Sequence, residues 1–231
     1  RHTFDASPAL PSVPTSFILT VHGSACIRDA WAEWHKVCPT RELIIVENFT
    51  ECDKRLALKR PDIDIFHAYV TIFEFARDTL PSGATIAVFE DDFFWDHPTH
   101  AAAALRDVDR FVRRAPDVDH YLLGCVPLLA LPTGAHWRAL LAGGLHAALH
   151  TARGMCRCAD AYARLTAARQ QQGTVNIDLL ISSRHCTYCY WRPLALQLFP
   201  ATRNRSQSWP TMCSTLLDMT NLATSAYPFY P

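Results

Sequence analysis

The chain of 231 residues has enough apolar material for a full core, with 49% hydrophobic and 19% charged residues, and this balance excludes extended disorder. Lys+Arg and Asp+Glu are equal at 22 each. The chain therefore lacks the broad basic surface that non-specific nucleic-acid binding requires, and we expect no nucleic-acid partner.

The first part of the chain predicts alternating strands and helices after an extended leader. Residues 1–15, with prolines at three-residue spacing, predict a leader that is poorly ordered or draped over the surface. Apolar, β-rich runs predict strands, and helical spacing of apolar residues predicts helices. In chain order these are strands at 16–21, 42–46, 85–89 and 121–125, and helices at 27–37, 64–80 and 99–115.

The pattern changes after Pro132, where we predict a strand at 145–151, a helix at 155–172, a short helical turn at 176–181 and a strand at 187–191. Apolar strands that alternate with helices indicate an α/β fold with a mostly parallel central sheet and helices on both faces. We predict a single domain at 16–199, between the leader and a C-terminal loop or tail at 200–231.

Membrane spans are not expected in this fragment. The longest apolar run, at 121–131, is interrupted by Gly124 and Pro127 and is shorter than the roughly 20 residues that a membrane span needs. We therefore expect a soluble domain, in the cytoplasm rather than secreted.

Three carboxylates, Glu90, Asp91 and Asp92, follow directly after the apolar run at 86–89. The carboxyl end of a central strand is where open α/β sheets bind ligands. Clustered like charges cost free energy there unless a cation compensates them. Carboxylate oxygens favour Mg²⁺ or Mn²⁺, which also bind phosphate oxygens, so we predict that these three residues hold Mn²⁺ or Mg²⁺ together with a nucleotide diphosphate.

A second interpretation of the acidic residues is purely structural. They would then form an acidic turn before the helix at 99–115, with Asp96 or Thr99 as the helix cap.

The order of these features resembles that of the family-25 glycosyltransferases, a group with the GT-A fold that includes lipopolysaccharide-type galactosyltransferases. The matching segments are 17–21, 65–76, 88–92, 146–160, 176–180, 193–197 and 206–208. The Glu-Asp-Asp segment matches sharply, whereas 66–71 departs from the family's Gly-Cys-Ala-Leu-Ser-His segment. The resemblance implies a metal-dependent hexosyltransferase that takes a nucleotide-diphosphate sugar as donor and a glycan or lipopolysaccharide-like hydroxyl as acceptor.

The resemblance also implies a general base. If the reaction inverts the anomeric centre in one displacement, a carboxylate must accept the proton of the acceptor hydroxyl. Asp178 lies in the turn that matches the family's Asp-bearing segment, and it is our candidate. The alternative is that Asp178 only stabilises the start of a helix through the helix dipole.

Further contacts to the substrates are expected from three parts of the chain. The loop after the first strand would frame the base and ribose of the donor, because Gly23 permits close backbone approach. Late arginines would close over the donor phosphates as a flexible loop, and tryptophan rings would stack on sugars. The predicted donor-binding residues are Val21, His22, Gly23, Ser24, Arg28, Arg203 and Arg205, and the predicted sugar-stacking residues are Trp95 and Trp209.

The cysteines suggest a rival site. Cys186 and Cys189 form a Cys-x-x-Cys pair next to His185, with Cys156 and Cys158 upstream. This spacing is compatible with structural zinc, and a disulfide among these cysteines is the alternative.

Two other functions remain open from the sequence. One is a catalytically inactive carbohydrate-binding protein with a GT-A-like fold, since a fold alone does not establish an activity. The other is a Mg²⁺-dependent nucleotidyltransferase or sugar-phosphate phosphatase, which would use the same acidic residues.

Overall fold

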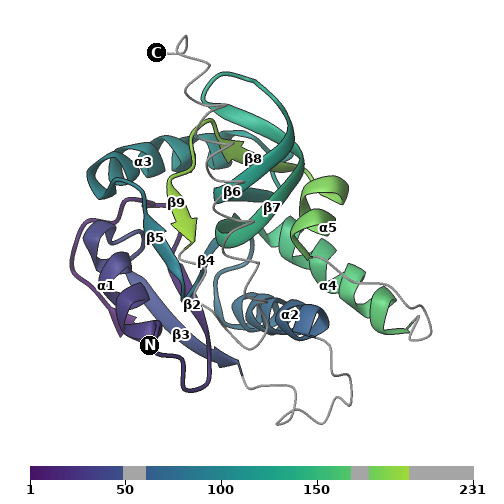
Figure 1. The fold of residues 1–231 in the computed structure, drawn as a ribbon, viewed down its shortest axis with the longest axis horizontal. Coiled ribbons are helices and arrows are strands. Elements are labelled where there is room, and N and C mark those ends of the chain that lie inside the picture. Colours follow the sequence, from purple (N-terminus) through teal and green to yellow (C-terminus); the bar gives the residue numbers. More distant parts are fainter. Residues whose placement is uncertain (49–60, 168–176, 198–231) are drawn as a thin grey trace, which may run out of the picture.

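The computed structural model describes residues 1–48, 61–167 and 177–197 (Figure 1). The strands are β1 (His2–Thr3), β2 (Thr15–Val21), β3 (Glu42–Asn48), β4 (Ile86–Glu90), β5 (Phe93–Trp95), β6 (His120–Leu131), β7 (His136–His150), β8 (Thr187–Tyr190) and β9 (Ala195–Gln197). The helices are α1 (Ile27–Val37), α2 (Pro61–Thr79), α3 (Pro98–Arg114), α4 (Ala152–Ala167) and α5 (Ile177–Arg184).

The central sheet is seven-stranded, in the order β1-β3-β2-β4-β7-β6-β8, and β5 pairs with β9 in a small separate sheet. β2 is parallel to β3 and β4, and β6 is parallel to β8. The remaining pairings among the described strands of this sheet are antiparallel. β7 runs antiparallel to β4, β6 and β8, and the short edge strand β1 runs antiparallel to β3. The prediction of an α/β fold with a mostly parallel sheet is therefore confirmed.

Helices cover both faces of the sheet, as Figure 1 shows. One core cluster joins α1 and α3 to one face, and the other joins α2, α4 and α5 to the opposite face. Strand β4 illustrates the division, because Ala87 and Phe89 belong to the first cluster whereas Ile86 and Val88 belong to the second. Successive side chains of a strand point to opposite faces, so a wholly apolar strand serves both cores.

The first fifteen residues differ from the expected loose leader. His2 and Thr3 pair with β3, and the Leu10 backbone N–H donates to the Pro39 carbonyl oxygen over 2.8 Å. Ala9, Leu10 and Val13 are buried in the core cluster of α1 and α3. Prolines keep this segment out of regular ladders because they lack an N–H, while the apolar side chains between them fill the core. The domain boundaries that we predict at 15 and 199 stay a prediction.

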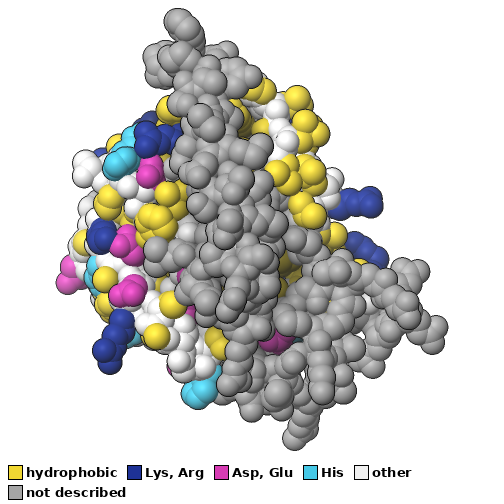
Figure 2. Space-filling model, in the orientation of Figure 1, with side chains coloured by type: hydrophobic (Ala, Val, Ile, Leu, Met, Phe, Trp, Pro, Cys, Tyr) yellow, Lys and Arg dark blue, Asp and Glu magenta, His cyan; other side chains and the backbone are white. Residues whose placement is uncertain are grey.

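Strands β6 and β7 form a longer hairpin than the sequence predicts. Gly124 and Pro127 suggested a break, but the pairing continues past both through shifts of register. Three leucines of β6 are exposed, namely Leu128 at 52%, Leu129 at 55% and Leu131 at 52%. Figure 2 shows apolar side chains gathered in the upper right of the view, where Figure 1 places this hairpin.

Candidate active site

The acidic residues stand at the carboxyl end of β4, in the middle of the parallel strands. Glu90 is the last residue of that strand, and Asp91 and Asp92 form the turn into β5. Asp92 is 4% exposed, whereas Glu90 and Asp91 are half-buried. Helix α3 begins after His97 and has no side-chain cap hydrogen bond, so the structural interpretation with Asp96 or Thr99 as cap is wrong.

Gln197 draws two of the carboxylates together. Antiparallel pairing of β5 with β9 sets Gln197 opposite Phe93 and therefore beside Asp92. The Gln197 Nε2 atom donates to Glu90 Oε2 over 3.2 Å and to both oxygens of Asp92 over 3.1 Å. Three carboxylate oxygens thus surround one N–H donor group, whose hydrogens carry a partial positive charge. An all-oxygen set that already converges fits a hard cation such as Mg²⁺ or Mn²⁺.

Asp91 points toward β2 instead. The Thr20 hydroxyl of β2 donates to Asp91 Oδ2 over 2.6 Å. β2 lies directly beside β4, with Leu19 opposite Glu90. The structure therefore separates the acidic residues into a converging pair, Glu90 and Asp92, and a third carboxylate that is held by the strand leading to the predicted donor loop.

That loop follows Thr20 at once. Val21 and His22 are exposed, and His22 Nδ1 lies 3.0 Å from Glu47 Oε2. Gly23 has a φ of 74°, a left-handed conformation that glycine adopts without strain. The Ser24 hydroxyl accepts the N–H of Cys26 over 3.2 Å, which ties the loop to the start of α1.

Cys26 shows how close the start of α1 is to the acidic residues. Burial raises the pKa of its thiol, and the charges of Asp91 and Asp92 raise that pKa further. Arg28 lies two residues further on, is exposed, and belongs to the first turn of α1. The predicted donor-binding residues that the structure describes therefore lie along one edge with Asp91.

Tyr69 of α2 links the acidic pair to the other side of the site. Its buried hydroxyl lies 3.2 Å from Glu90 Oε1 and 3.0 Å from the Leu145 carbonyl oxygen, and it shares its one hydrogen between these acceptors. Burial raises the pKa of this phenol well above its usual value, and the charges of Glu90 and Asp178 raise it further. Glu90 and Asp178 thus act on the same phenol.

Asp178 is the second residue of α5 and is anchored to β7. Its Oδ2 atom accepts the backbone N–H of Gly144 over 2.9 Å. Gly144 has a φ of 91°, a conformation that strains residues with a side chain. The predicted general base therefore lies at the same edge of the sheet as the acidic residues. Its place in the first turn also suits the helix dipole, so the two interpretations do not exclude each other.

The structure does not bring every predicted residue to this site. Trp95 is 3% exposed, its indole N–H donates to the Glu33 carbonyl oxygen over 2.9 Å, and its ring packs on Phe89 and Phe93. Trp95 is consequently a core residue and offers a sugar no free ring face. Arg203, Arg205 and Trp209 lie outside the described residues.

Sequence reasoning missed several residues that shape the site. Tyr69 lies within the helix predicted at 64–80, where a tyrosine at an apolar position gives no signal of a site. Thr20 and Gly144 lie within strands whose pattern is apolar. Gln197 ends the 193–197 segment of the family resemblance, and that segment is its signal in the sequence.

The cysteines do not form the predicted Cys-x-x-Cys zinc site or a disulfide. The cysteines of the described residues are all free, and Cys156 is exposed. The Cys186 thiol donates to Asp117 Oδ2 over 3.2 Å, while Cys189 is buried against Cys125. Cys158, in contrast, lies beside His120 and His185.

Comparison with known proteins supports the fold and not a family. No family model matches the chain, and no curated protein matches its sequence. Among solved structures, the chain is similar to a glycosyltransferase involved in the glycosylation of the major capsid of PBCV-1, with a TM-score of 0.50 and 9% identity over 81% of this chain and 96% of that chain. The chain has a GT-A-like fold.

Two further solved structures are more distant. Mannose-1-phosphate geranyltransferase from Thermus thermophilus has a TM-score of 0.46 and 9% identity over 77% of this chain and 74% of that one. Mouse xyloside xylosyltransferase 1 has a TM-score of 0.39 and 8% identity over 74% of this chain and 82% of that one.

Across the described parts of the chain, none of the helices combines the length and apolarity needed to cross a membrane.

Proposed function

We propose that this protein is a metal-dependent, inverting glycosyltransferase. It would move a hexose from a nucleotide-diphosphate sugar to a hydroxyl of a glycan or lipopolysaccharide-like acceptor. This is the reaction that its resemblance to the family-25 glycosyltransferases implies. The observation that carries the proposal is the convergence of Glu90 and Asp92 at the carboxyl end of β4, with Asp178 at the same edge of the sheet.

Glu90 and Asp92 are the residues that would hold Mn²⁺ or Mg²⁺, since their oxygens already converge on one nitrogen of Gln197. When bound, the ion neutralises the negative charge that builds on the departing diphosphate. Gln197 keeps the two carboxylates together against their mutual repulsion, and Thr20 holds Asp91 beside the donor loop.

Asp178 would accept the proton of the acceptor hydroxyl as the new glycosidic bond forms. The Gly144 N–H orients the carboxylate of Asp178, because the position of a backbone donor is set by the strand that carries it. The Tyr69 hydroxyl donates toward Glu90, and the charges of Glu90 and Asp178 both raise the pKa of this phenol.

The donor would lie along the edge formed by the loop after β2. Val21, His22, Gly23 and Ser24 would frame the base and ribose, since this loop lies next to Asp91. Arg28 would reach the diphosphate. The remaining candidates for donor and sugar contacts are Arg203, Arg205 and Trp209.

A panel of nucleotide sugars tests this function directly. Thermal unfolding is measured with each sugar, once with Mn²⁺ and once with a chelator. We expect one donor to raise the melting temperature only with metal, because ligand at about 100 times its dissociation constant stabilises a protein by about 2.7 kcal/mol. Asp92→Asn should lose this shift. Asp78→Asn, which changes an exposed carboxylate of α2, should keep it.

The product then identifies the reaction. A transferase releases a nucleoside diphosphate, and a nucleotidyltransferase releases pyrophosphate. A binding protein without activity would be stabilised by a donor or a glycan but would release neither product. Absence of a shift with every nucleotide sugar would count against a transferase.

A further inference from the structure

A group of two histidines and a cysteine lies at the opposite edge of the sheet from the acidic residues. His120 begins β6, Cys158 lies within α4, and His185 directly follows α5. All three are buried, and the most exposed of them, His185, is 8% exposed. His150 of β7 pairs with His120 on one side and with Ile86, the first residue of β4, on the other. The group therefore lies at the amino ends of the parallel strands.

The distances within the group suit a metal ion. His120 Nε2 lies 2.9 Å from His185 Nδ1, and Cys158 Sγ lies 3.8 Å from each of these nitrogens. A point about 2.1 Å from all three atoms lies in their plane, close to the Zn–N distance of about 2.0–2.1 Å and a little short of the Zn–S distance of about 2.3 Å. We propose that His120, Cys158 and His185 bind a zinc ion.

The donor atoms decide which metal the group takes. Two imidazole nitrogens and a thiolate sulfur are softer ligands than carboxylate oxygens, and this set favours Zn²⁺ over Mg²⁺ and Mn²⁺. The two edges of the same sheet would thus select different metals: a hard cation at Glu90 and Asp92, and zinc at the histidine-cysteine group.

Burial favours the form of the two histidines that binds a metal. Burial lowers the pKa of His120 well below its usual value, and the neighbouring His150 and His185 lower it further. Burial also lowers the pKa of His185. The lowered pKa favours the neutral form of each ring, and a neutral imidazole has one nitrogen lone pair to share with a metal.

The cysteine must lose a proton when the metal binds. Burial raises the pKa of the Cys158 thiol far above its usual value, so without metal the sulfur keeps its hydrogen. On binding, the S–H bond breaks, a Zn–S bond forms with the sulfur electron pair, and the proton passes to solvent. No oxidant or reductant takes part in this exchange.

A neighbouring histidine fixes the orientation of His120. His120 Nδ1 lies 2.8 Å from His150 Nδ1, so His120 can donate its Nδ1 hydrogen to His150 and keep the Nε2 lone pair for the metal. The other nitrogen of His150, Nε2, is buried and has no hydrogen-bond partner in the part of the chain that the structure describes. Metal ligands are commonly held by such an outer hydrogen bond.

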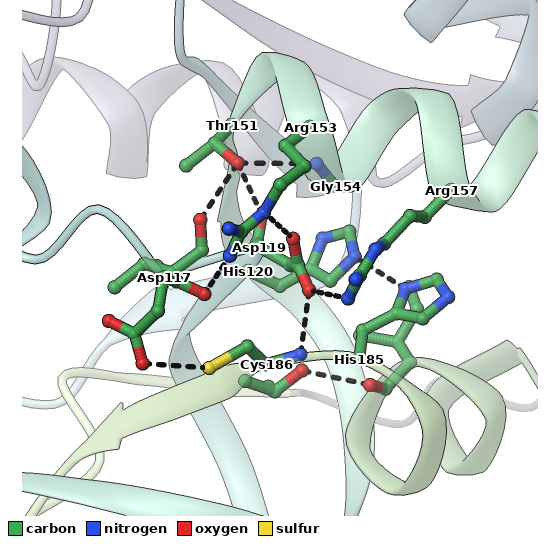
Figure 3. Close-up of polar contacts among 12 residues, drawn as sticks. Asp117, Asp119, His120, Thr151, Arg153, Gly154, Arg157, His185 and Cys186 are labelled. Atoms are coloured by element: carbon green, nitrogen blue, oxygen red, sulfur yellow. Dashed lines mark hydrogen bonds and ion pairs between the residues drawn. The ribbon is translucent and has the colours of Figure 1, made fainter.

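Asp119 holds the elements around the group in place, as Figure 3 shows. Its buried carboxylate accepts hydrogen bonds from Arg153 Nε and Arg157 Nη1, at 2.6 Å each, and from the Cys186 backbone N–H at 2.8 Å. The arginines lie on α4 together with Cys158, and Cys186 directly follows His185. Because Asp119 precedes His120, this one carboxylate joins all three ligand-bearing segments and pre-forms the group.

Metal content and affinity test the proposal. The full chain is produced in zinc-supplemented medium, its metals are quantified, and the metal-free protein is titrated with Zn²⁺ against a chromophoric chelator. We expect one zinc per chain. Cys158→Ser should weaken zinc binding by at least about 100-fold, since loss of even an outer partner costs about 10- to 100-fold. Cys156 is an exposed cysteine of the same helix, and the Cys156→Ser variant should bind zinc with the same affinity as the unmodified protein.

Cobalt gives a spectroscopic readout of the thiolate ligand. Co²⁺ bound to a thiolate shows an intense near-ultraviolet charge-transfer band, which oxygen ligands do not produce. The unmodified protein and Asp92→Asn should both show this band, because the acidic pair is not involved. Absence of the band from the unmodified protein, or equal zinc affinity in the Cys158→Ser and Cys156→Ser variants, would overturn the proposal.

Discussion

The backbone N–H of Gly144 on β7 anchors Asp178, and this contact shapes the effect of substituting the residue. An Asp178→Asn side chain is the same size and keeps a carbonyl oxygen for that bond, but it cannot take up the acceptor proton. We expect transfer to fall by about 10²- to 10⁴-fold, the usual contribution of a general base, while nucleotide-sugar binding stays unchanged. Product release and thermal shift measure the two effects separately, and retained turnover would exclude the role.

The two glycines at 143 and 144 give a matched pair of variants. A methyl group at Gly144 would meet His146 Nδ1 at 3.2 Å and would also strain a backbone with a φ of 91°. At Gly143 nothing lies within 4 Å of the added carbon. We expect Gly144→Ala to cost about 1–2 kcal/mol of stability and to lower transfer, because the N–H that orients Asp178 moves. Urea denaturation and turnover measurements should give Gly143→Ala nearly the same stability and activity as the unmodified protein. Equal losses of stability and activity in the two variants would contradict this account.

At the scale of elements, the small β5–β9 sheet carries the acidic pair. We expect Gln197→Ala to lower the metal-free melting temperature by about 2–8 °C, since losing the hydrogen bonds of this half-buried amide to two carboxylates costs about 1–2 kcal/mol. Mn²⁺ should stabilise this variant more than the parent, because the ion replaces the lost positive partner. Gln197→Glu, which adds a like charge, should show both effects more strongly. Identical Mn²⁺-induced shifts in all three proteins would mean that Gln197 does not hold the carboxylates together.

The same elements show what the sequence can predict. Helix α1 and strand β4 were predicted well, since each has a strong local period and clear ends, and Glu90-Asp91-Asp92 was found because an apolar strand leads into it. β5 and β9 were missed, because three residues are too short to show a period. The contact of Gln197 with Asp92 depends on pairing between segments about a hundred residues apart in sequence, and no local pattern encodes that register.

At the scale of the whole molecule, one strand joins two chemically different edges. β4 begins at Ile86, beside His150, and ends at Glu90, so the two groups are separated by about 13 Å of strand at about 3.3 Å per residue. The sequence predicted the acidic edge from one continuous segment. It did not predict the histidine-cysteine group, because His120, Cys158 and His185 come from three elements that only the folded sheet brings together.

This separation predicts that the two edges act independently on stability. Sites more than about 7–10 Å apart without shared partners usually contribute additively, within about 0.5 kcal/mol. We therefore expect the change in unfolding free energy of the Asp92→Asn, Cys158→Ser double variant, measured by urea denaturation with Mn²⁺ and Zn²⁺ present, to equal the sum of the two single changes. A coupling above about 1 kcal/mol would instead show that β4 and β7 transmit strain between the edges, so that metal binding at one edge would alter the affinity of the other.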